Sequence, residues 1–470
     1  MYLKSVVYAI GLSALLLASA CQGEHQSVYV DLDDPSVMDR KFTVQELRED
    51  TAYLFKRLHA LHPDLDSRLS PADRAALEAS VLAQIERPMT RREFYRLIGA
   101  TTEHFRDGHA GVFYPYPEFD RFAATGAGVF PMTVTATADG LFVKKDYSAK
   151  DALPAGTRLL AINGIPVADM LREMSRYTRG ETPVLREQIV ADDFNKLLWH
   201  FHEFKDSFEV EYEAPGGVRK ATVVGIRNED FNDAVEEAEE AGGENVAYRS
   251  LGDGVGYLDV SYFGGDEGDF KRVVNKAVEA ARKEKIRAIV VDLRRNPGGS
   301  TDNVEILLAR LSSKECQLVS RIREKLNDKS GTGLFAKGKP GELIELDMDT
   351  TVSPASESKR FPGKVYVLIG PYTYSAAIVM ATAVQDCGVG VLVGEETAGF
   401  GNQTGQIYFF NLPHTQIRAF APTRIMLRPN GVEGSSPVVP DHLAPPTLET
   451  MRADRDAAIE RAKALALDND

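Results

Sequence analysis

Three short segments, far apart in the sequence, carry residue types that suit a hydroxyl nucleophile, its base and an acid. Ser375 follows a buried strand predicted over residues 365–370 and a tight turn, and it opens an apolar helix predicted over residues 375–384. Unpaired N–H groups and the helix dipole at such a start favour negative charge, including an oxyanion formed when the hydroxyl attacks a carbonyl. An ordinary N-cap serine is the alternative interpretation.

A base must remove the proton of a serine hydroxyl before it becomes a strong nucleophile, and a third group must orient that base. His109 lies in the sequence Asp107-Gly108-His109 after a predicted helix, where the glycine permits an abrupt change of direction. Loops that end regular elements typically display catalytic side chains. Glu433 lies in a late loop between glycines and could orient an imidazole, although a solvated turn glutamate gives the same pattern.

A second glycine loop, over residues 296–300, follows a strand predicted over residues 288–293 and opens a helix. The adjacent glycines at 298 and 299 would let a backbone N–H approach a ligand closely, as an oxyanion or phosphate donor must. The spacing fits neither a P-loop nor a dinucleotide fingerprint. His200 and His202 could share one face of a strand, but no third metal ligand follows nearby. No metal or nucleotide cofactor is therefore expected.

The length and charge of the chain limit its architecture and its partners. A chain of 470 residues is too long for one compact core, and we expect about two to four domains. The net charge of −14 argues against nucleic acid and against an anionic membrane surface as partners.

The N-terminus has the pattern of an export signal. Lys4, an apolar run over residues 6–17 and a small-residue cleavage site predict a signal peptide over residues 1–20. Cys21 follows directly, so the segment resembles a bacterial lipoprotein signal, with simple secretion as the alternative. We expect acylation of Cys21 and attachment on the periplasmic side of the outer membrane, or else release into the periplasm. The remaining cysteines, Cys316 and Cys387, could form one disulfide.

Periodicity and composition divide the rest of the chain into regions that must position these residues. We predict a polar tether (21–41), a helical region (42–125), a β-rich region (126–227), an acidic linker or exposed helix (228–245), and alternating strands and helices closed by an amphipathic helix (246–470). The alternation predicts an α/β layer architecture with a largely buried sheet.

Together these segments resemble the S41 family of serine peptidases, the C-terminal processing and tricorn-like proteases, over nearly the whole mature chain. The similar stretches stand in the family's order: HPDL, DGHAG, VVDLRRNPGGS, TYSAA, LVGEETAG and EGSSPVVPD. One branch of the family uses a Ser-Lys dyad, but Phe400 stands where that lysine would fall, and no lysine occurs between Lys364 and Lys463. The resemblance therefore implies the tricorn-like branch, which uses serine, histidine and an acid.

The resemblance also implies roles for individual residues. Ser375 would be the nucleophile, His109 the general base and then acid, and Glu433 the carboxylate that orients His109, with the N–H groups of Gly298 and Ala376 as the oxyanion hole. Gly108 departs from tricorn, in which a serine precedes the histidine.

The implied fold is an α/β multidomain chain with a helical N-terminal region, a PDZ-like β-rich module and a ClpP/crotonase-like protease core. The implied activity is endopeptidase action on envelope polypeptides. A non-catalytic peptide- or ligand-binding protein on the same scaffold is the alternative, and a hydrolase acting on esters is a third interpretation of the same residues.

Overall fold

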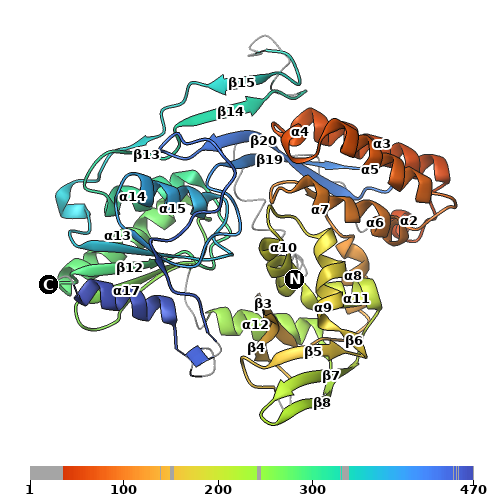
Figure 1. The fold of residues 1–470 in the computed structure, drawn as a ribbon, viewed down its shortest axis with the longest axis horizontal. Coiled ribbons are helices and arrows are strands. Elements are labelled where there is room, and N and C mark those ends of the chain that lie inside the picture. Colours follow the sequence, from red (N-terminus) through yellow and green to blue (C-terminus); the bar gives the residue numbers. More distant parts are fainter. Residues whose placement is uncertain are drawn as a thin grey trace, which may run out of the picture.

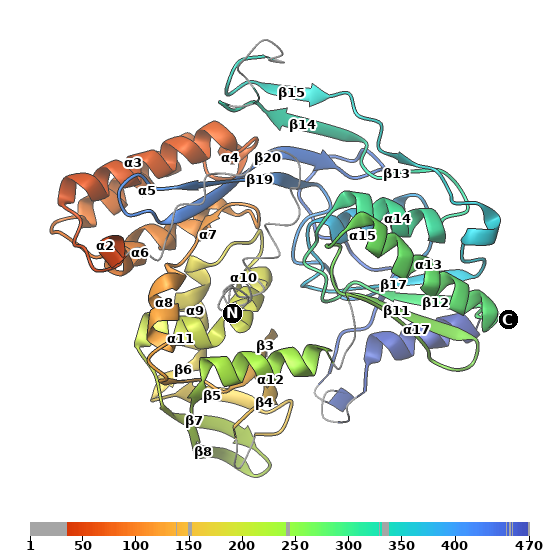
Figure 2. The same ribbon diagram turned by 180° about the vertical axis from the view of Figure 1, so that it is seen from behind.

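The computed structural model describes residues 35–137, 139–148, 153–240, 245–328, 330, 338–447, 449–450, 453 and 455–468. The predicted signal peptide, Cys21 and most of the tether lie outside these residues. The described chain is a mixed α/β protein with several sheets (Figures 1 and 2). Within the described part, no helix combines the length and the apolar character needed to span a bilayer.

The C-terminal half is built on one sheet that is buried on both faces. Its strands, in spatial order, are β10 (Val246–Ser250), β11 (Val255–Val260), β12 (Ala288–Asp292), β17 (Lys364–Ile369), β18 (Val391–Gly394) and β21 (His442–Leu443). β10 pairs antiparallel with β11, and all the other pairs are parallel. A largely parallel sheet needs helices on both faces, which explains why β12 and β17 are almost continuously apolar.

Four helices cover this sheet, as the alternating pattern predicts. They are α13 (Glu267–Lys283), α14 (Thr301–Leu311), α15 (Ala376–Asp386) and α17 (Ala457–Leu467). Ile289 and Val291 of β12 pack in one buried cluster with residues of α13, α14 and α15, whereas Val290 packs in another with Ala458 and Ala462 of α17. The alternate side chains of one strand thus fill two apolar layers.

The N-terminal region is helical, as predicted. It contains α2 (Pro35–Met38), α3 (Val44–Leu61), α4 (Leu65–Arg68), α5 (Pro71–Gln84), α6 (Arg91–Ile98), η2 (Gly99–Thr101), α7 (Thr102–Phe105) and α8 (Tyr116–Ala123). Capping boxes fix two of the starts: Thr43 with Glu46 begins α3, and Thr90 with Glu93 begins α6.

A second sheet forms the β-rich region. It contains β3 (Met132–Thr137), β4 (Gly140–Asp146), β5 (Arg158–Ile162), β6 (Ile165–Pro166), β7 (Ser207–Ala214) and β8 (Gly217–Val224), and nearby β2 (Gly128–Val129) pairs with β9 (Ile226–Arg227). Its helices are α9 (Val167–Met174), η3 (Ser175–Tyr177), α10 (Pro183–Asp192) and α11 (Phe194–His202), and α12 (Asn228–Glu240) follows the region.

One sequence interpretation changes here. His200 and His202 lie on helix α11 and not on a strand, because the short apolar run that contains them suits either element. The His200 ring packs edge-on against Tyr95 at a centroid distance of 5.2 Å. The acidic stretch is a helix over Asn228–Glu240, which is one of the two alternatives expected from the sequence.

A third sheet joins the N-terminal helices to the core. It contains β1 (Gly111–Val112), β20 (Arg418–Leu427), β14 (Arg321–Lys325) and β15 (Leu343–Leu346), and β19 (Gln403–Asn411) also pairs with β20. β19 and β20 run alongside the N-terminal helices in both views (Figures 1 and 2). β1 pairs antiparallel with β20, so a strand from the N-terminal region completes a sheet that begins in the core.

A buried carboxylate attaches the tip of the β19–β20 hairpin to helix α3. Asp50 accepts the N–H groups of His414 at 2.9 Å and of Thr415 at 2.8 Å. The Thr415 hydroxyl donates to the same carboxylate at 2.6 Å. Because Asp50 is fully buried, this turn and this helix hold each other in place.

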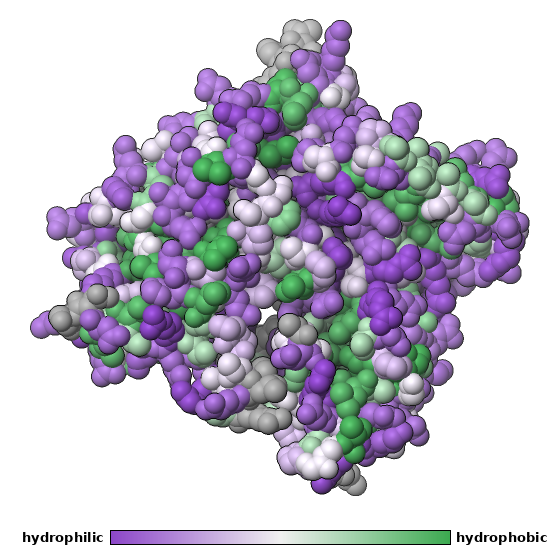
Figure 3. Space-filling model, in the orientation of Figure 1, coloured by the Kyte–Doolittle hydropathy of each residue, from purple (hydrophilic) through white to green (hydrophobic). Residues whose placement is uncertain are grey.

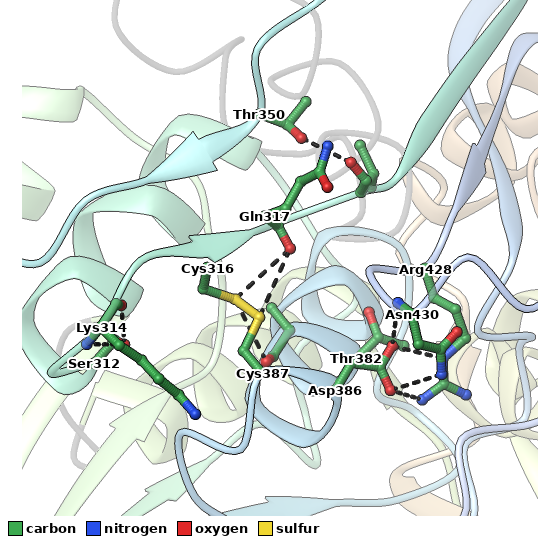
Figure 4. Close-up of a disulfide and its surroundings, with 12 residues drawn as sticks. Ser312, Lys314, Cys316, Gln317, Thr350, Thr382, Asp386, Cys387, Arg428 and Asn430 are labelled. Carbon is green, nitrogen blue, oxygen red and sulfur yellow. Dashed lines mark hydrogen bonds and ion pairs between the residues drawn. A yellow bond between two sulfur atoms is a disulfide. The ribbon is translucent and has the colours of Figure 1, made fainter.

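A disulfide crosses the core near the end of α15 (Figure 4). Cys316 and Cys387 are bonded with a Cα–Cα distance of 5.8 Å, which decides the question that the sequence left open. Cys316 begins β13 (Cys316–Gln317), which pairs with β16 (Thr351–Val352) before η4 (Glu357–Lys359). Beside it, Arg428 binds the Asp386 carboxylate through Nε at 2.9 Å and Nη2 at 2.7 Å.

The face of the molecule seen in Figure 3 carries mainly hydrophilic residues with smaller hydrophobic patches between them. The exposed large hydrophobic side chains of the described residues are scattered over several elements, such as Val218 and Val224 on β8 and Val432 in a late loop. Scattered exposed side chains of this kind are ordinary and mark no single interface.

Candidate active site

Ser375 lies at a strained turn between strand β17 and helix α15. Its backbone has φ 53° and ψ −122°, a conformation that residues with a side chain rarely adopt. The Thr373 hydroxyl fixes the turn, because it accepts the Gly370 N–H at 3.0 Å and donates to the Leu293 carbonyl at 2.9 Å. The Ser375 side chain makes no capping hydrogen bond to α15, so the N-cap interpretation does not describe this serine. A strand–turn–helix of this kind presents a nucleophile outside the helix.

His109 reaches Ser375 from the N-terminal region. Helix α7 ends at Phe105, and Arg106 turns the chain with φ 48°. Asp107 Oδ1 accepts the His109 N–H at 2.7 Å and fixes the next turn. β1 then ties the chain to β20, and His109 Nε2 lies 3.1 Å from Ser375 Oγ. The structure thus brings together the predicted nucleophile and the predicted base, which are 266 positions apart in sequence.

Two hydroxyl groups face the other ring nitrogen of His109. Nδ1 lies 3.2 Å from the Tyr374 hydroxyl and 3.3 Å from Thr404 Oγ1. Thr404 Oγ1 lies 2.8 Å from each carboxylate oxygen of Asp107, which itself lies 3.8 Å from Nδ1. Since the Thr404 hydroxyl donates to Asp107, its lone pair is left to accept Nδ1–H. That arrangement favours the tautomer whose Nε2 lone pair faces Ser375.

Asp107 is a buried carboxylate with cationic and polar support. The His62 ring accepts the Asp64 N–H at Nδ1 at 3.0 Å, so Nε2 carries the proton and donates to Asp107 at 3.0 Å. Arg68 Nε lies 3.6 Å from the same carboxylate. Burial alone would raise the pKa of Asp107, but Arg68 and His62 outweigh it and hold this pKa below its ordinary value. Asp107 is therefore ionised beside the imidazole.

The ring of His109 is neutral at ordinary pH. Burial lowers its pKa to about 4; the Asp107 charge opposes this shift, and Arg179, Arg68 and His62 add to it. A neutral imidazole can accept a proton from Ser375, and Asp107 favours the imidazolium that results. The site thus holds a base in its reactive form.

A second carboxylate lies behind Tyr374. The Tyr374 hydroxyl donates to Glu181 Oε1 at 2.8 Å. Burial, together with the Asp107 charge, raises the pKa of Glu181 to about 7. The two acids near His109 thus differ in protonation: Asp107 is held ionised, whereas Glu181 is close to half protonated at neutral pH.

The predicted oxyanion hole is only partly formed. The Ala377 and Ile378 N–H groups donate to carbonyls of the preceding turn, whereas the Ala376 N–H has no acceptor among the described residues. The Gly298 N–H donates to Asn296 Oδ1 at 2.8 Å. This corrects its expected assignment as an oxyanion donor, because the Asn296 side chain already occupies it. Gly298 serves the site sterically, since a Cβ there would lie 2.6 Å from Ser375 Cβ.

Glu433 is not brought to His109, which corrects the acid expected from the sequence. Its side chain is 65% exposed and lies 3.3 Å from both Arg321 Nη1 and Arg323 Nη2. The two arginines are on the same face of strand β14 and attract this carboxylate to the surface. Asp107 and Glu181 are the carboxylates that approach His109 in the described structure.

Sequence reasoning missed most of the residues that support His109. Asp107 is in the same short motif as the histidine and could have been found from its position at the turn. Tyr374 precedes the nucleophile directly, and His62 lies in the HPDL stretch. Thr404 and Glu181 carried no local signal, because their places depend on the β19–β20 hairpin and on the segment before α10.

Comparison with known proteins supports this interpretation of the fold. Residues 254–441 match the model of peptidase family S41, a region that contains Ser375 but not His109. The structure is similar to mature CPAF, with a TM-score of 0.66 and 15% identity, covering 90% of this chain and 96% of that one. Mature CPAF complexed with lactacystin gives a TM-score of 0.64 and 15% identity, covering 90% and 98%. No curated protein matches the sequence.

Proposed function

We propose that the chain is a serine peptidase of family S41, the family whose model matches residues 254–441, and that it cleaves polypeptides through an acyl-enzyme on Ser375. The observation that carries the proposal is the 3.1 Å contact between Ser375 Oγ and His109 Nε2. The hydroxyl groups and the buried carboxylate behind Nδ1 support it, because they favour the tautomer that can act as a base.

The proposed reaction follows from these positions. His109 Nε2 takes the proton of Ser375 as Oγ bonds to the peptide carbonyl carbon, and the Ala376 N–H stabilises the oxygen that becomes negative. The imidazolium then donates its proton to the leaving amine as the C–N bond breaks. Water activated by the same imidazole attacks the acyl-enzyme and releases the second product. Asp107 acts through Thr404 by stabilising the imidazolium in both halves.

We propose that the enzyme works outside the cytoplasm, attached through Cys21 or released into the periplasm. The disulfide between Cys316 and Cys387 supports this location, since disulfides persist mainly in oxidising compartments. The substrates would be envelope polypeptides. A PDZ-like role of the β-rich region, in which an extended peptide adds to a sheet edge, belongs to the same proposal.

The experiment is hydrolysis of a fluorogenic peptide library by wild type and Ser375→Ala, with circular dichroism to check folding. We expect kcat/KM to fall by at least about 10³-fold in the variant, with the peptide Kd nearly unchanged. The matched control is Ser70→Ala, which removes the side chain that caps helix α5 by accepting the Asp73 N–H. It should lower stability by about 1 kcal/mol and leave kcat/KM unchanged.

The two alternatives predict other outcomes. A binding protein without catalysis would show the same negligible turnover in wild type and Ser375→Ala. An esterase would cleave activated esters through Ser375 but no peptide in the library. Cleavage that persists in Ser375→Ala would remove this serine from the mechanism.

A further inference from the structure

We propose that Glu181 is a second positioning residue, which acts on His109 through the Tyr374 hydroxyl and makes turnover dependent on pH. This inference rests on the proposed function, because it assumes that His109 is the base of a serine peptidase. It assigns a role to a carboxylate that belongs to none of the stretches used to recognise the family.

The Tyr374 hydroxyl connects the carboxylate to the imidazole. It lies 2.8 Å from Glu181 Oε1 and 3.2 Å from His109 Nδ1, and the two rings are tilted with centroids 4.9 Å apart. A phenol has one proton to donate and lone pairs that accept. When Glu181 is ionised, its carboxylate accepts a hydrogen bond from the Tyr374 hydroxyl. A lone pair of the Tyr374 oxygen is then left to accept the Nδ1–H of His109. The Nε2 lone pair then faces Ser375.

The absence of a side chain at position 108 makes room for this hydroxyl. A Cβ on Gly108 would lie 2.2 Å from the Tyr374 hydroxyl oxygen and 2.5 Å from Cζ. Tyr374 is 4% exposed, and its hydroxyl has a fixed place between Glu181 and His109. Gly108 thus leaves room for a hydroxyl from a different part of the chain.

The charges around Glu181 make its protonation sensitive to pH. Asp107, from the loop before β1, raises its pKa, whereas Arg68 of α4 and the hydrogen bond from Tyr374 lower it, and burial outweighs both. Arg179, from the same segment as Glu181, donates to the Gly108 carbonyl at 2.9 Å, and His109 faces the other side of Tyr374. Glu181 Oε2 is buried and has no hydrogen-bond partner among the described residues.

Protonation of Glu181 should weaken the base. A neutral carboxyl can donate to the Tyr374 oxygen, which frees the phenol proton to point at Nδ1. The imidazole is then favoured in the tautomer that carries its proton on Nε2, and this form cannot accept the proton of Ser375. We expect kcat/KM to rise about tenfold as pH increases through about 7, a factor typical of one hydrogen bond to a charged group.

The test is the pH dependence of peptide hydrolysis in wild type and Glu181→Gln, an isosteric change that cannot ionise. At about pH 8 the variant should have a kcat about tenfold lower with KM unchanged. Its kcat/KM should stay flat between about pH 5.5 and 8, near the wild-type value at the acid end. Tyr374→Phe should show the same profile, and the double variant should lose no further activity.

Matched controls separate this role from simple loss of packing. Glu187→Gln on α10 changes a part-buried glutamate whose pKa burial also raises. Tyr372→Phe changes the same turn as Tyr374, and it removes a hydroxyl that interacts with Asp192 of α10. Both should keep the rise near pH 7. If Tyr374→Phe does not fold, Glu181→Gln alone decides the question.

Each proposal can fail separately. Glu181→Gln that keeps both the wild-type kcat and the rise near pH 7 would overturn the positioning role, while cleavage that still requires Ser375 would leave the peptidase standing. If wild type cleaves no peptide and forms no adduct with a fluorophosphonate, the proposed function itself fails.

Discussion

At the scale of single residues, the site is an imidazole held between a strained serine and two hydroxyl groups. His109 is oriented by Thr404 and Tyr374, each of which donates to a different buried carboxylate. The acids therefore act at a distance, through hydroxyl groups, and not by a direct short bond to Nδ1. This arrangement lets one acid stay charged while the other titrates.

The first prediction at this scale compares the acids. Asp107→Asn should lower kcat/KM by about 10³-fold, because it removes the charge that stabilises the imidazolium and weakens the tautomer preference. Glu433→Gln should stay within about twofold of wild type, because that side chain is exposed and pairs with arginines of β14. The assay is peptide hydrolysis at about pH 8, with thermal unfolding of both variants. The opposite ranking would restore Glu433 as the acid and contradict the structure.

A second prediction concerns the protonation of His109. Its lowered pKa, to about 4, means that the base stays neutral as pH falls below the ordinary histidine value of 6.5. In Glu181→Gln, where the titration near pH 7 is absent, kcat/KM should fall only around pH 4. The imidazole C–H resonance in an NMR titration reports the same pKa directly. A midpoint near 6.5 in either measurement would show that the ring is not desolvated as described.

The sequence allowed part of this site to be predicted, for a physical reason. Ser375 and His109 lie in local patterns, a strand–turn–helix and a glycine turn, that distinguish them without tertiary information. Glu433 lies in a local pattern that could orient an imidazole. Only the fold shows that its carboxylate pairs with Arg321 and Arg323 instead. Thr404 and Glu181 could not be found, since nothing in their own segments marks them.

At the scale of elements, the β19–β20 hairpin decides whether the site assembles. It carries Thr404, it pairs with the strand that follows His109, and its tip is held by Asp50 of α3. The core strands and helices were predictable because each of them keeps the apolar pattern of its own type along its whole length. The hairpin was not, since its turn at Pro413 lacks the Asn-Gly or Asp-Gly signal of a tight hairpin.

The prediction at this scale is that Asp50→Ala loosens the hairpin tip. The change leaves buried N–H groups of His414 and Thr415 without their acceptor, which should lower the free energy of unfolding by about 1–3 kcal/mol. Urea denaturation measures this loss, and Lys56→Gln, at an exposed position of the same helix, is the control. Since the hairpin supports His109, peptide hydrolysis should fail at a lower urea concentration in the variant. Equal midpoints for Asp50→Ala and wild type would contradict the account.

At the scale of the whole molecule, the proposed nucleophile and its proposed base come from different regions. Ser375 belongs to the sheet-based core, and His109 belongs to the helical N-terminal region, joined to the core by the third sheet. The region that matches the family model, residues 254–441, contains Ser375 but not His109. If His109 is the base, as proposed, the core alone lacks it, and we expect activity to require the N-terminal region.

A stability prediction also belongs to the whole molecule. The Cys316–Cys387 disulfide closes a long loop, with a sequence separation of 71. Replacing both cysteines by serine should lower the free energy of unfolding by about 2–4 kcal/mol, mainly because the unfolded chain gains freedom. Denaturation of wild type with and without a reductant should show the same loss, and the double variant should be insensitive to reductant. Equal stability of all the samples would contradict the prediction.

The most direct test of the account maps a fluorophosphonate adduct on the full chain by mass spectrometry. We expect one adduct, on Ser375, with a labelling rate at least about 10³-fold slower in His109→Ala and no adduct at that position in Ser375→Ala. An adduct on another residue, or an unchanged rate in a folded His109→Ala, would contradict the pairing of this serine with this histidine.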